Sequence, residues 1–139
     1  MFTVDQLTHR GDGRLPGLLG IVCTNAGPGE IHLQLQVRPD LMAPNGYLHA
    51  ATVVALADTS TGYGCFSNLP EGATGFTTVE LKSNHVGTAR DGTIKSVAKP
   101  VHRGRNTQVW DAVVTHLETG KTIAMFRCTQ MILYAKQGA

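Results

Sequence analysis

The chain has 139 residues, a length that suits a single domain, so we expect residues 1–139 to form one folded unit. Its formal net charge is only +2, which is too small for the basic surface of a typical nucleic-acid-binding protein. The three cysteines are widely spaced in apolar segments, and this predicts buried, reduced thiols in a cytoplasmic protein rather than disulfides or a zinc site.

The N-terminal part predicts short elements. Residues 3–9 fit a helix, because Thr3 is a good cap and Gln6 follows three residues later. Residues 10–17 are rich in Gly and charge and predict a loop, and a strand is expected over 19–25. No run reaches the roughly 20 apolar residues that a membrane-spanning helix needs, so we expect neither a secretory leader nor a membrane partner.

The segment Glu30–Arg38 alternates between apolar and polar residues without a break. Ile31, Leu33, Leu35 and Val37 face one way, and the polar residues between them face the other. This pattern predicts a half-buried strand with one wet face.

The middle of the chain predicts one long helix. Residues 39–48 form a loop with two prolines, and residues 49–64 are Ala-rich and free of Pro, long enough for about four helical turns. Apolar residues lie on nearly every side of this helix through Ala57, which predicts a buried helix.

Four strand-like segments follow, joined by short connectors that carry turn residues and therefore favour antiparallel neighbours. They cover about 75–86, 93–101, 107–117 and 122–133. Pro100 predicts a bulge or an edge in the second of them.

This order of elements predicts an α+β fold in which a long antiparallel sheet of about six strands wraps around one central helix. One helix covers only part of one sheet face, so we expect a second subunit to cover the remainder and the sheet edges.

Asp58 is the residue that stands out, because it follows five apolar residues in the predicted buried helix and an unpaired carboxylate is costly to bury. Three interpretations stay open. Asp58 marks the solvated end of the helix, accepts structural hydrogen bonds, or is a catalytic carboxylate.

His49 comes just before the helix and is either an ordinary first-turn residue or a group that orients a carbonyl beside the free N–H groups of the helix start. His49 and Asp58 are nine residues apart, which places them on opposite faces and about 13.5 Å apart along the axis. If both serve one site, two subunits must supply it.

The region of the helix start carries GYLHAA at residues 46–51 and VALADT at residues 54–59. Two later segments read VELKSNHV at 79–86 and VHRGRNTQVW at 101–110. Together they resemble hotdog-fold thioesterases of the phenylacetate-degradation (PaaI-like) and 4-hydroxybenzoyl-CoA type, whose motif is G-x-x-H-G-G…L-A-(D/E). The resemblance extends from about residue 15 to residue 134.

The resemblance implies a hydrolase that cleaves an aryl or medium-chain acyl-CoA to the free acid and CoA. In it, the Ala50 N–H is the oxyanion donor, His49 holds the carbonyl, and Asp58 of the other subunit is general base or nucleophile. Thr78 matches a position where some members carry a water-positioning hydroxyl, although Thr also simply favours strands. The implied assembly is a homodimer at minimum and a homotetramer in full.

Two departures from the family pattern affect this expectation. Many members have Asn or Gln six residues before the His, where this chain has Ala43, and the H-G-G of the motif is H-A-A here. The alternative is therefore a non-catalytic acyl-CoA-binding protein that kept the fold. A hotdog dehydratase or hydratase ranks low, since the sequence lacks the His and acid arrangement that such enzymes need.

Coenzyme A carries phosphates, and the turn at residues 102–105 offers basic groups for them. Arg103 and Arg105 flank Gly104, with His102 beside them, although solvated turn charges are an equally good interpretation. CoA is part of the substrate, so no cofactor is expected. The six histidines are scattered without ligand spacing, and no metal is expected either.

Three aromatic residues are candidates for an acyl pocket. They are Tyr63, Phe76 and Trp110. Core packing is the competing interpretation for each of them.

Overall fold

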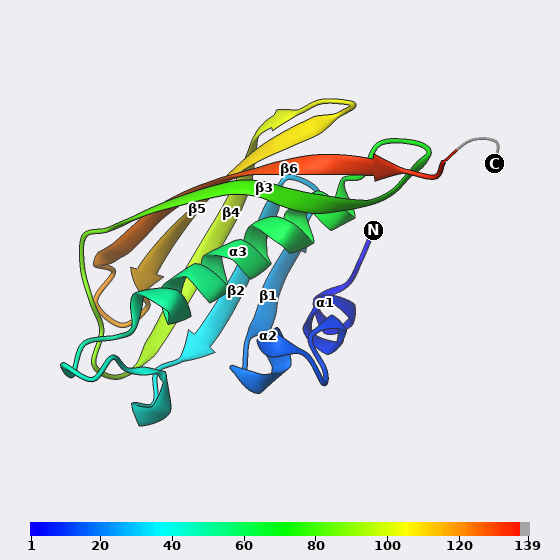
Figure 1. The fold of residues 1–139 in the computed structure, drawn as a ribbon. Helices are drawn as coiled ribbons and strands as arrows, with labels where there is room; N and C mark the ends of the chain where they lie inside the picture. The colour runs from blue at the N-terminus through cyan, green and yellow to red at the C-terminus, as the bar shows by residue number, and fades with distance from the viewer. Residues whose placement is uncertain (137–139) are drawn as a thin grey trace.

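In the computed structural model, which describes residues 1–136, six strands form one antiparallel sheet in the spatial order β1-β2-β4-β5-β6-β3 (Figure 1). The sheet curves around one central helix, as expected for the α+β fold. The strands are β1 (Val22–Gly27), β2 (Glu30–Gln36), β3 (Ala73–His85), β4 (Thr93–Arg103), β5 (Thr107–His116) and β6 (Thr122–Tyr134). The helices are α1 (Val4–Arg10), α2 (Leu15–Leu18), the 3-10 helix η1 (Pro39–Leu41) and α3 (Ala50–Ser67).

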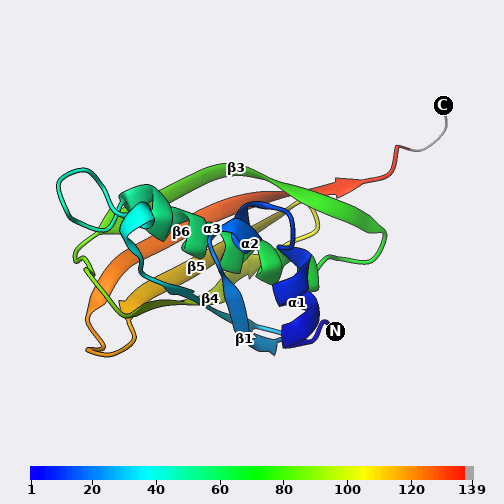
Figure 2. The same ribbon diagram turned by 90° about the horizontal axis from the view of Figure 1, so that it is seen from below.

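The central helix α3 packs against the inner face of the sheet (Figures 1 and 2). One face of it is fully buried, and its opposite face, which includes Val54, Asp58 and Gly62, is only half-buried. The expectation of a buried helix is therefore correct only for one face of a single chain, because the described residues 1–136 cover the second face only in part. The helix also runs three residues beyond Gly64, where the Trp110 ring packs so closely that a Cβ would lie 2.5 Å from it.

The N-terminal elements agree in part with the sequence. The helix at 3–9 is confirmed, with a capping box in which the Thr3 hydroxyl accepts from the Gln6 N–H at 3.1 Å. The expected loop over 10–17 is wrong in part, because α2 begins at Leu15. Pro16 near the start of α2 is compatible with a helix, since the first turn needs no N–H partner there.

The strands lie within a few residues of their expected bounds. Burial alternates along β2, as its sequence pattern predicts. In β4 the pairing with β5 shifts register between Pro100 and His102, which confirms the bulge. In β3, burial is low along the whole strand, because β3 forms the edge of the sheet and pairs only with β6. No helix among residues 1–136 has the length and apolar character needed to cross a membrane.

Candidate active site

The start of α3 presents an unpaired backbone donor. His49 is the N-cap, and its Nδ1 accepts from the Ala51 N–H at 2.9 Å. Within residues 1–136, the Ala50 N–H has no hydrogen-bond acceptor. Both His49 and Ala50 are exposed. The helix dipole adds partial positive charge here, so this turn is suited to bind an oxyanion.

The hydrogen bond at Nδ1 also fixes the proton of the His49 ring. Because Nδ1 accepts, the neutral imidazole carries its proton on Nε2. His49 therefore offers an Nε2–H donor beside the Ala50 N–H. His49 and Ala51 border a hollow of about 350 Å³ whose other walls include Asp40 and the apolar side chains of Leu15, Leu19 and Met42.

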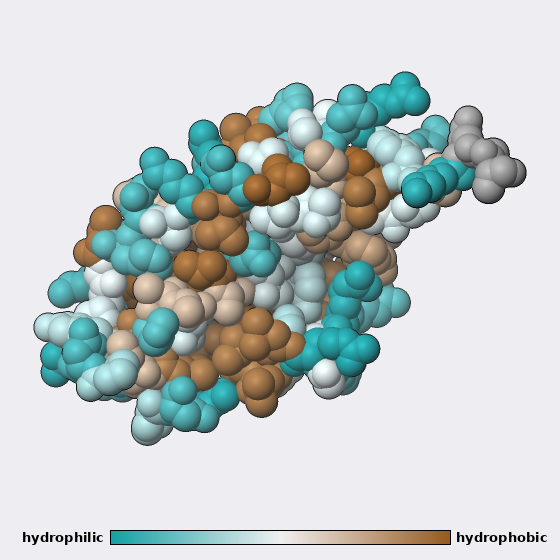
Figure 3. Space-filling model, viewed as in Figure 1, coloured by the Kyte–Doolittle hydropathy of each residue, from teal (hydrophilic) through white to brown (hydrophobic). Residues whose placement is uncertain are grey.

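The loop before α3 holds this start in place. The Ala43 N–H donates to the Tyr47 carbonyl at 2.7 Å, and the Leu48 N–H donates to the Thr88 hydroxyl at 3.2 Å. Inside the helix, the Thr52 hydroxyl donates to the Leu41 carbonyl at 2.9 Å. Figure 3 shows apolar atoms gathered over α2, which borders the same hollow.

Asp58 lies two turns further along α3, in a second pocket of about 210 Å³. Its Oδ1 atom is buried and has no hydrogen-bond partner among residues 1–136. Burial raises the pKa of this carboxyl group above its usual value. Because the helix continues to Ser67, the interpretation of Asp58 as a solvated helix end is wrong. A buried acid with an unsatisfied oxygen is typical of a functional carboxylate.

Thr78 borders the same pocket from β3. Its hydroxyl donates to Oε1 of Gln130 at 2.7 Å, and Gln130 is fully buried. Since the hydroxyl proton is committed to Gln130, the Thr78 oxygen can act toward a group in the pocket only as an acceptor. A water between Thr78 and Asp58 would find an acceptor on each side.

Three aromatic residues contribute to the rest of this pocket. Its other walls are formed by Arg10, Pro16, Thr59, Gly62, Tyr63, Phe66 and Phe76. Tyr63 and Phe76 thus line the pocket that contains Asp58, whereas Trp110 is completely buried in the core and donates to Gln108 at 2.7 Å. Sequence reasoning missed Phe66, although the four-residue spacing of Asp58, Gly62 and Phe66 places all three on one helix face. It also missed Arg10, for which no sequence signal exists.

The two parts of the predicted site remain apart within one chain. His49 borders one hollow and Asp58 another, and no residue is common to the two walls. The separation expected from the sequence therefore holds for the single subunit.

The turn with the basic residues forms a third hollow of about 370 Å³, which Arg103, Gly104 and Arg105 line together with Asn68. The Arg103 guanidinium donates to Oδ1 of Asn68 at 2.5 Å. A side chain on Gly104 would lie 2.7 Å from Nε2 of His102, so this glycine allows the imidazole to pack against the turn. All the basic groups of the turn are exposed to solvent.

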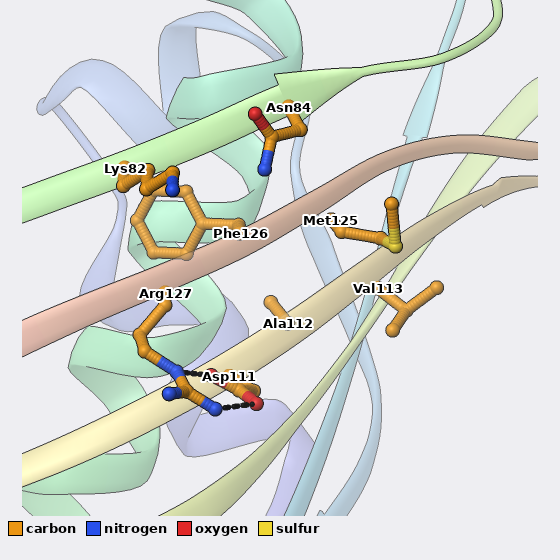
Figure 4. A pocket seen from close by; sticks show the side chains of 8 residues that line it. All are labelled: Lys82, Asn84, Asp111, Ala112, Val113, Met125, Phe126 and Arg127. Carbon is orange, nitrogen blue, oxygen red and sulfur yellow. Dashed lines mark hydrogen bonds and ion pairs between the residues drawn. The ribbon is translucent and has the colours of Figure 1, made fainter.

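A further hollow of about 350 Å³ lies on the outer face of the sheet, away from α3 (Figure 4). Lys82 and Asn84 border it from β3, and Arg127 donates to both carboxylate oxygens of Asp111 at 2.6 and 2.9 Å. No predicted catalytic residue lines it. Within the described residues, no cluster of three or more His, Cys, Asp or Glu side chains is arranged to hold a metal ion.

Known proteins are similar to this chain in sequence and in fold. A family model described as the thioesterase superfamily matches residues 45–128. The 1,4-dihydroxy-2-naphthoyl-CoA hydrolase of Escherichia coli K12 is 31% identical over 134 residues, which cover 94% of this chain and 95% of that protein. The thioesterase HI1161 of Haemophilus influenzae superposes with a TM-score of 0.91 at 27% identity, covering 100% of this chain and 96% of that one.

The PaaI protein of E. coli, from the phenylacetic acid degradation operon, shares the fold, with a TM-score of 0.78 at 22% identity over 87% of this chain and 85% of that one. These similarities confirm the hotdog fold that the sequence motifs imply.

Proposed function

The chain belongs to the thioesterase superfamily and is a thioester hydrolase, and from this premise we propose that it hydrolyses aryl-CoA thioesters to the free acid and CoA. The observation that carries the proposal is Asp58, a partly buried carboxyl group with an unsatisfied oxygen at the wall of an aromatic pocket. The aryl preference is supported by the three aromatic rings of that pocket and by its volume of about 210 Å³, which is small for a long chain. It is also supported by the naphthoyl substrate that the E. coli relative's name gives.

The proposed reaction assigns protein groups to the proton of the attacking water and to the oxyanion. A water molecule attacks the thioester carbonyl carbon and transfers a proton to Asp58. The carbonyl electron pair moves onto its oxygen, where the Ala50 N–H and the Nε2–H of His49 donate to it. When the tetrahedral intermediate collapses, the carbon–sulfur bond breaks and CoA leaves as the thiolate. The raised pKa of Asp58 makes it a stronger base than an exposed carboxylate.

Asp58 has a second possible role, attack on the carbonyl carbon to form an anhydride. A single turnover with excess enzyme in ¹⁸O-water separates the two. A general base places the label in the first acid molecule released. A nucleophile whose anhydride is opened by water at the Asp58 carbonyl leaves the label on the enzyme.

A homodimer is proposed because one chain does not complete the site. The 13-residue strand β3 has an outer edge without a strand partner in the described chain, and Val79 and Leu81 are exposed there. Such an edge favours pairing with another strand. If two copies pair through β3 about a two-fold axis, the two α3 helices become antiparallel, and the start of one comes beside the Asp58 turn of the other.

We extend this proposal to a homotetramer through the outer face of the sheet. Val101, Val113 and Met125 are between 42% and 53% exposed on this face, and two hollows lie beside them. A charge introduced by Val113→Glu should reduce the mass measured by light scattering from that of a tetramer to that of a dimer. A wild-type protein that is dimeric or monomeric at the same concentration contradicts the tetramer.

Arg103 and Arg105, with His102 and Gly104 shaping the turn, are proposed to bind the phosphates of CoA. Comparing an acyl-CoA with the matching acyl-pantetheine, which has no phosphates, tests this. Arg105→Ala should raise KM a few-fold for the CoA ester and leave the pantetheine ester unaffected.

The proposed function as a whole is tested with a panel of aryl- and alkyl-CoA thioesters and detection of the free thiol. We expect turnover of aryl esters and little turnover of long alkyl esters. A wild-type protein that binds acyl-CoA in calorimetry without hydrolysing any ester would instead support the non-catalytic binding protein, to which Ala43 and the H-A-A segment point.

A further inference from the structure

The pocket that contains Asp58 ends in a guanidinium group. Along α3 its wall is formed by Asp58, Gly62 and Phe66, which lie on one helix face and span about 12 Å. The Arg10 guanidinium carbon lies 3.6 Å from the centre of the Phe66 ring. The positive charge of Arg10 lowers the pKa of Tyr63, against a larger effect of burial. Because Arg10 lies over the ring of Phe66, eight residues beyond Asp58 on the helix, it belongs to the end of the pocket remote from the Asp58 carboxylate.

The backbone around Arg10 is held rigidly. Gly11, which caps α1, accepts at its carbonyl from the N–H groups of Arg14 at 3.0 Å and Gly17 at 2.9 Å. A side chain on Gly17 would collide with that carbonyl. The Thr8 hydroxyl accepts from the Cys23 N–H at 2.9 Å, which ties α1 to β1. The wall that carries Arg10 is thus anchored to the sheet.

The guanidinium of Arg10 makes no hydrogen bond or ion pair with any other of the residues 1–136. The acid closest to it in sequence, Asp12, is paired with Nδ1 of His9 at 2.9 Å instead. A guanidinium stacked on a ring keeps its N–H donors in its own plane, where they are free to meet a ligand. Arg10 is exposed, so these donors are hydrated, and an oxygen of a ligand could replace that water whereas an aliphatic acyl group could not.

We propose that Arg10 is a specificity-determining residue that binds an oxygen-bearing substituent on an aryl acyl group, at the ring position remote from the thioester. The aromatic side chains Tyr63, Phe66 and Phe76 would contact the ring, and Arg10 would donate to a phenolic or carboxylate oxygen beyond it. This inference rests on the proposed aryl-CoA hydrolysis and names the substrate class within it.

The test compares three substrates, benzoyl-CoA, para-hydroxybenzoyl-CoA and para-carboxybenzoyl-CoA, on wild type, Arg10→Met and Arg10→Lys. We expect Arg10→Met to lower kcat/KM about 10- to 100-fold for a substituted ester and to leave benzoyl-CoA unchanged, as the loss of one charge-assisted hydrogen bond predicts. The hydroxyl and carboxylate esters show which oxygen Arg10 binds. Arg10→Lys keeps the positive charge but not the planar guanidinium, and its kcat/KM for the substituted esters should lie between those of wild type and Arg10→Met.

An equal loss of kcat/KM on all three substrates would show that Arg10 only supports the pocket wall. Unchanged kcat/KM on all three would show that Arg10 does not contact the substrate. Either result overturns the inference while leaving the hydrolase in place. If wild type hydrolyses none of the three, both the inference and the aryl-CoA proposal fail. The melting temperatures of the variants identify any loss that comes from unfolding.

Discussion

The first turn of α3 and its middle turn have opposite chemistry. At the first turn, the Ala50 N–H and the His49 Nε2–H are exposed donors, and the one acid of the adjoining hollow, Asp40, is paired with Arg38 at 2.8 Å. At the middle turn, Asp58 is a half-buried acid whose Oδ1 has no donor within the described chain. The helical rise fixes the two turns about 13.5 Å apart along the axis. In the proposed mechanism each turn supplies half of the hydrolytic site, and a second copy of the helix is needed to bring the halves together.

The largest effect is expected from removing the acid. Asp58→Asn should lower kcat on the order of 1,000-fold, because the amide keeps the size of the side chain but cannot accept a proton from water. Asp58→Glu is the matched control, since it keeps a carboxyl group and should retain part of the activity. Initial rates with an aryl-CoA ester measure both. An Asp58→Asn protein as active as wild type would remove the basis of the mechanism.

A second experiment tests whether the halves come from different subunits. His49→Ala and Asp58→Asn chains are co-expressed with different tags, and the mixed dimers are compared with each parent. If the site is shared, every mixed dimer has one intact site, and a random mixture should recover about a quarter of wild-type activity.

Mixing two Asp58→Asn preparations provides the control, because it creates no intact site. If His49 and Asp58 of the same chain worked together, each site of a mixed dimer would keep one defect. Activity would then stay at the level of the parents.

The first turn is tested by removing one backbone N–H donor. Ala50→Pro deletes the N–H at the first helical position, where Pro is well tolerated, and the extended conformation of His49 (φ −64°, ψ 131°) suits a residue before Pro. We expect a loss on the order of 100-fold in kcat with little change in melting temperature. Ala50→Gly keeps the donor and should stay near wild type. Undiminished activity of Ala50→Pro would assign the oxyanion to another group.

The same two turns show how far the sequence predicts the site. His49, Ala50 and Asp58 stand out along the chain, because a polar residue at a helix start or in an apolar helix is conspicuous. Arg10 is not, because its position depends on how α1 packs against β1 and Phe66. A contact between such distant segments leaves no local pattern.

Local rules also failed where packing determines the structure. Gly64 looked like a helix end, yet α3 continues to Ser67, since the glycine is needed for the close approach of Trp110. By contrast, the strands followed their period and their turns, and their bounds were therefore close to the expected ones.

The smallest effect concerns the pH dependence of stability, to which the middle turn should contribute through Asp58. Burial raises the pKa of Asp58 in the folded protein, so the folded state holds this proton more tightly than the unfolded state. Wild type should then lose stability as the pH rises from about 3.8, the ordinary value for Asp, through the raised pKa.

Asp58→Asn removes this loss and should be more stable than wild type at neutral pH by about 1 kcal/mol, with the difference vanishing below pH 3.8. Melting temperatures from pH 3 to pH 8 measure it. Glu71→Gln, at an exposed residue, controls for the removal of one charge and should follow wild type. Parallel curves for wild type and Asp58→Asn would mean that the carboxyl is solvated, and the contrast between the two turns of α3 would disappear.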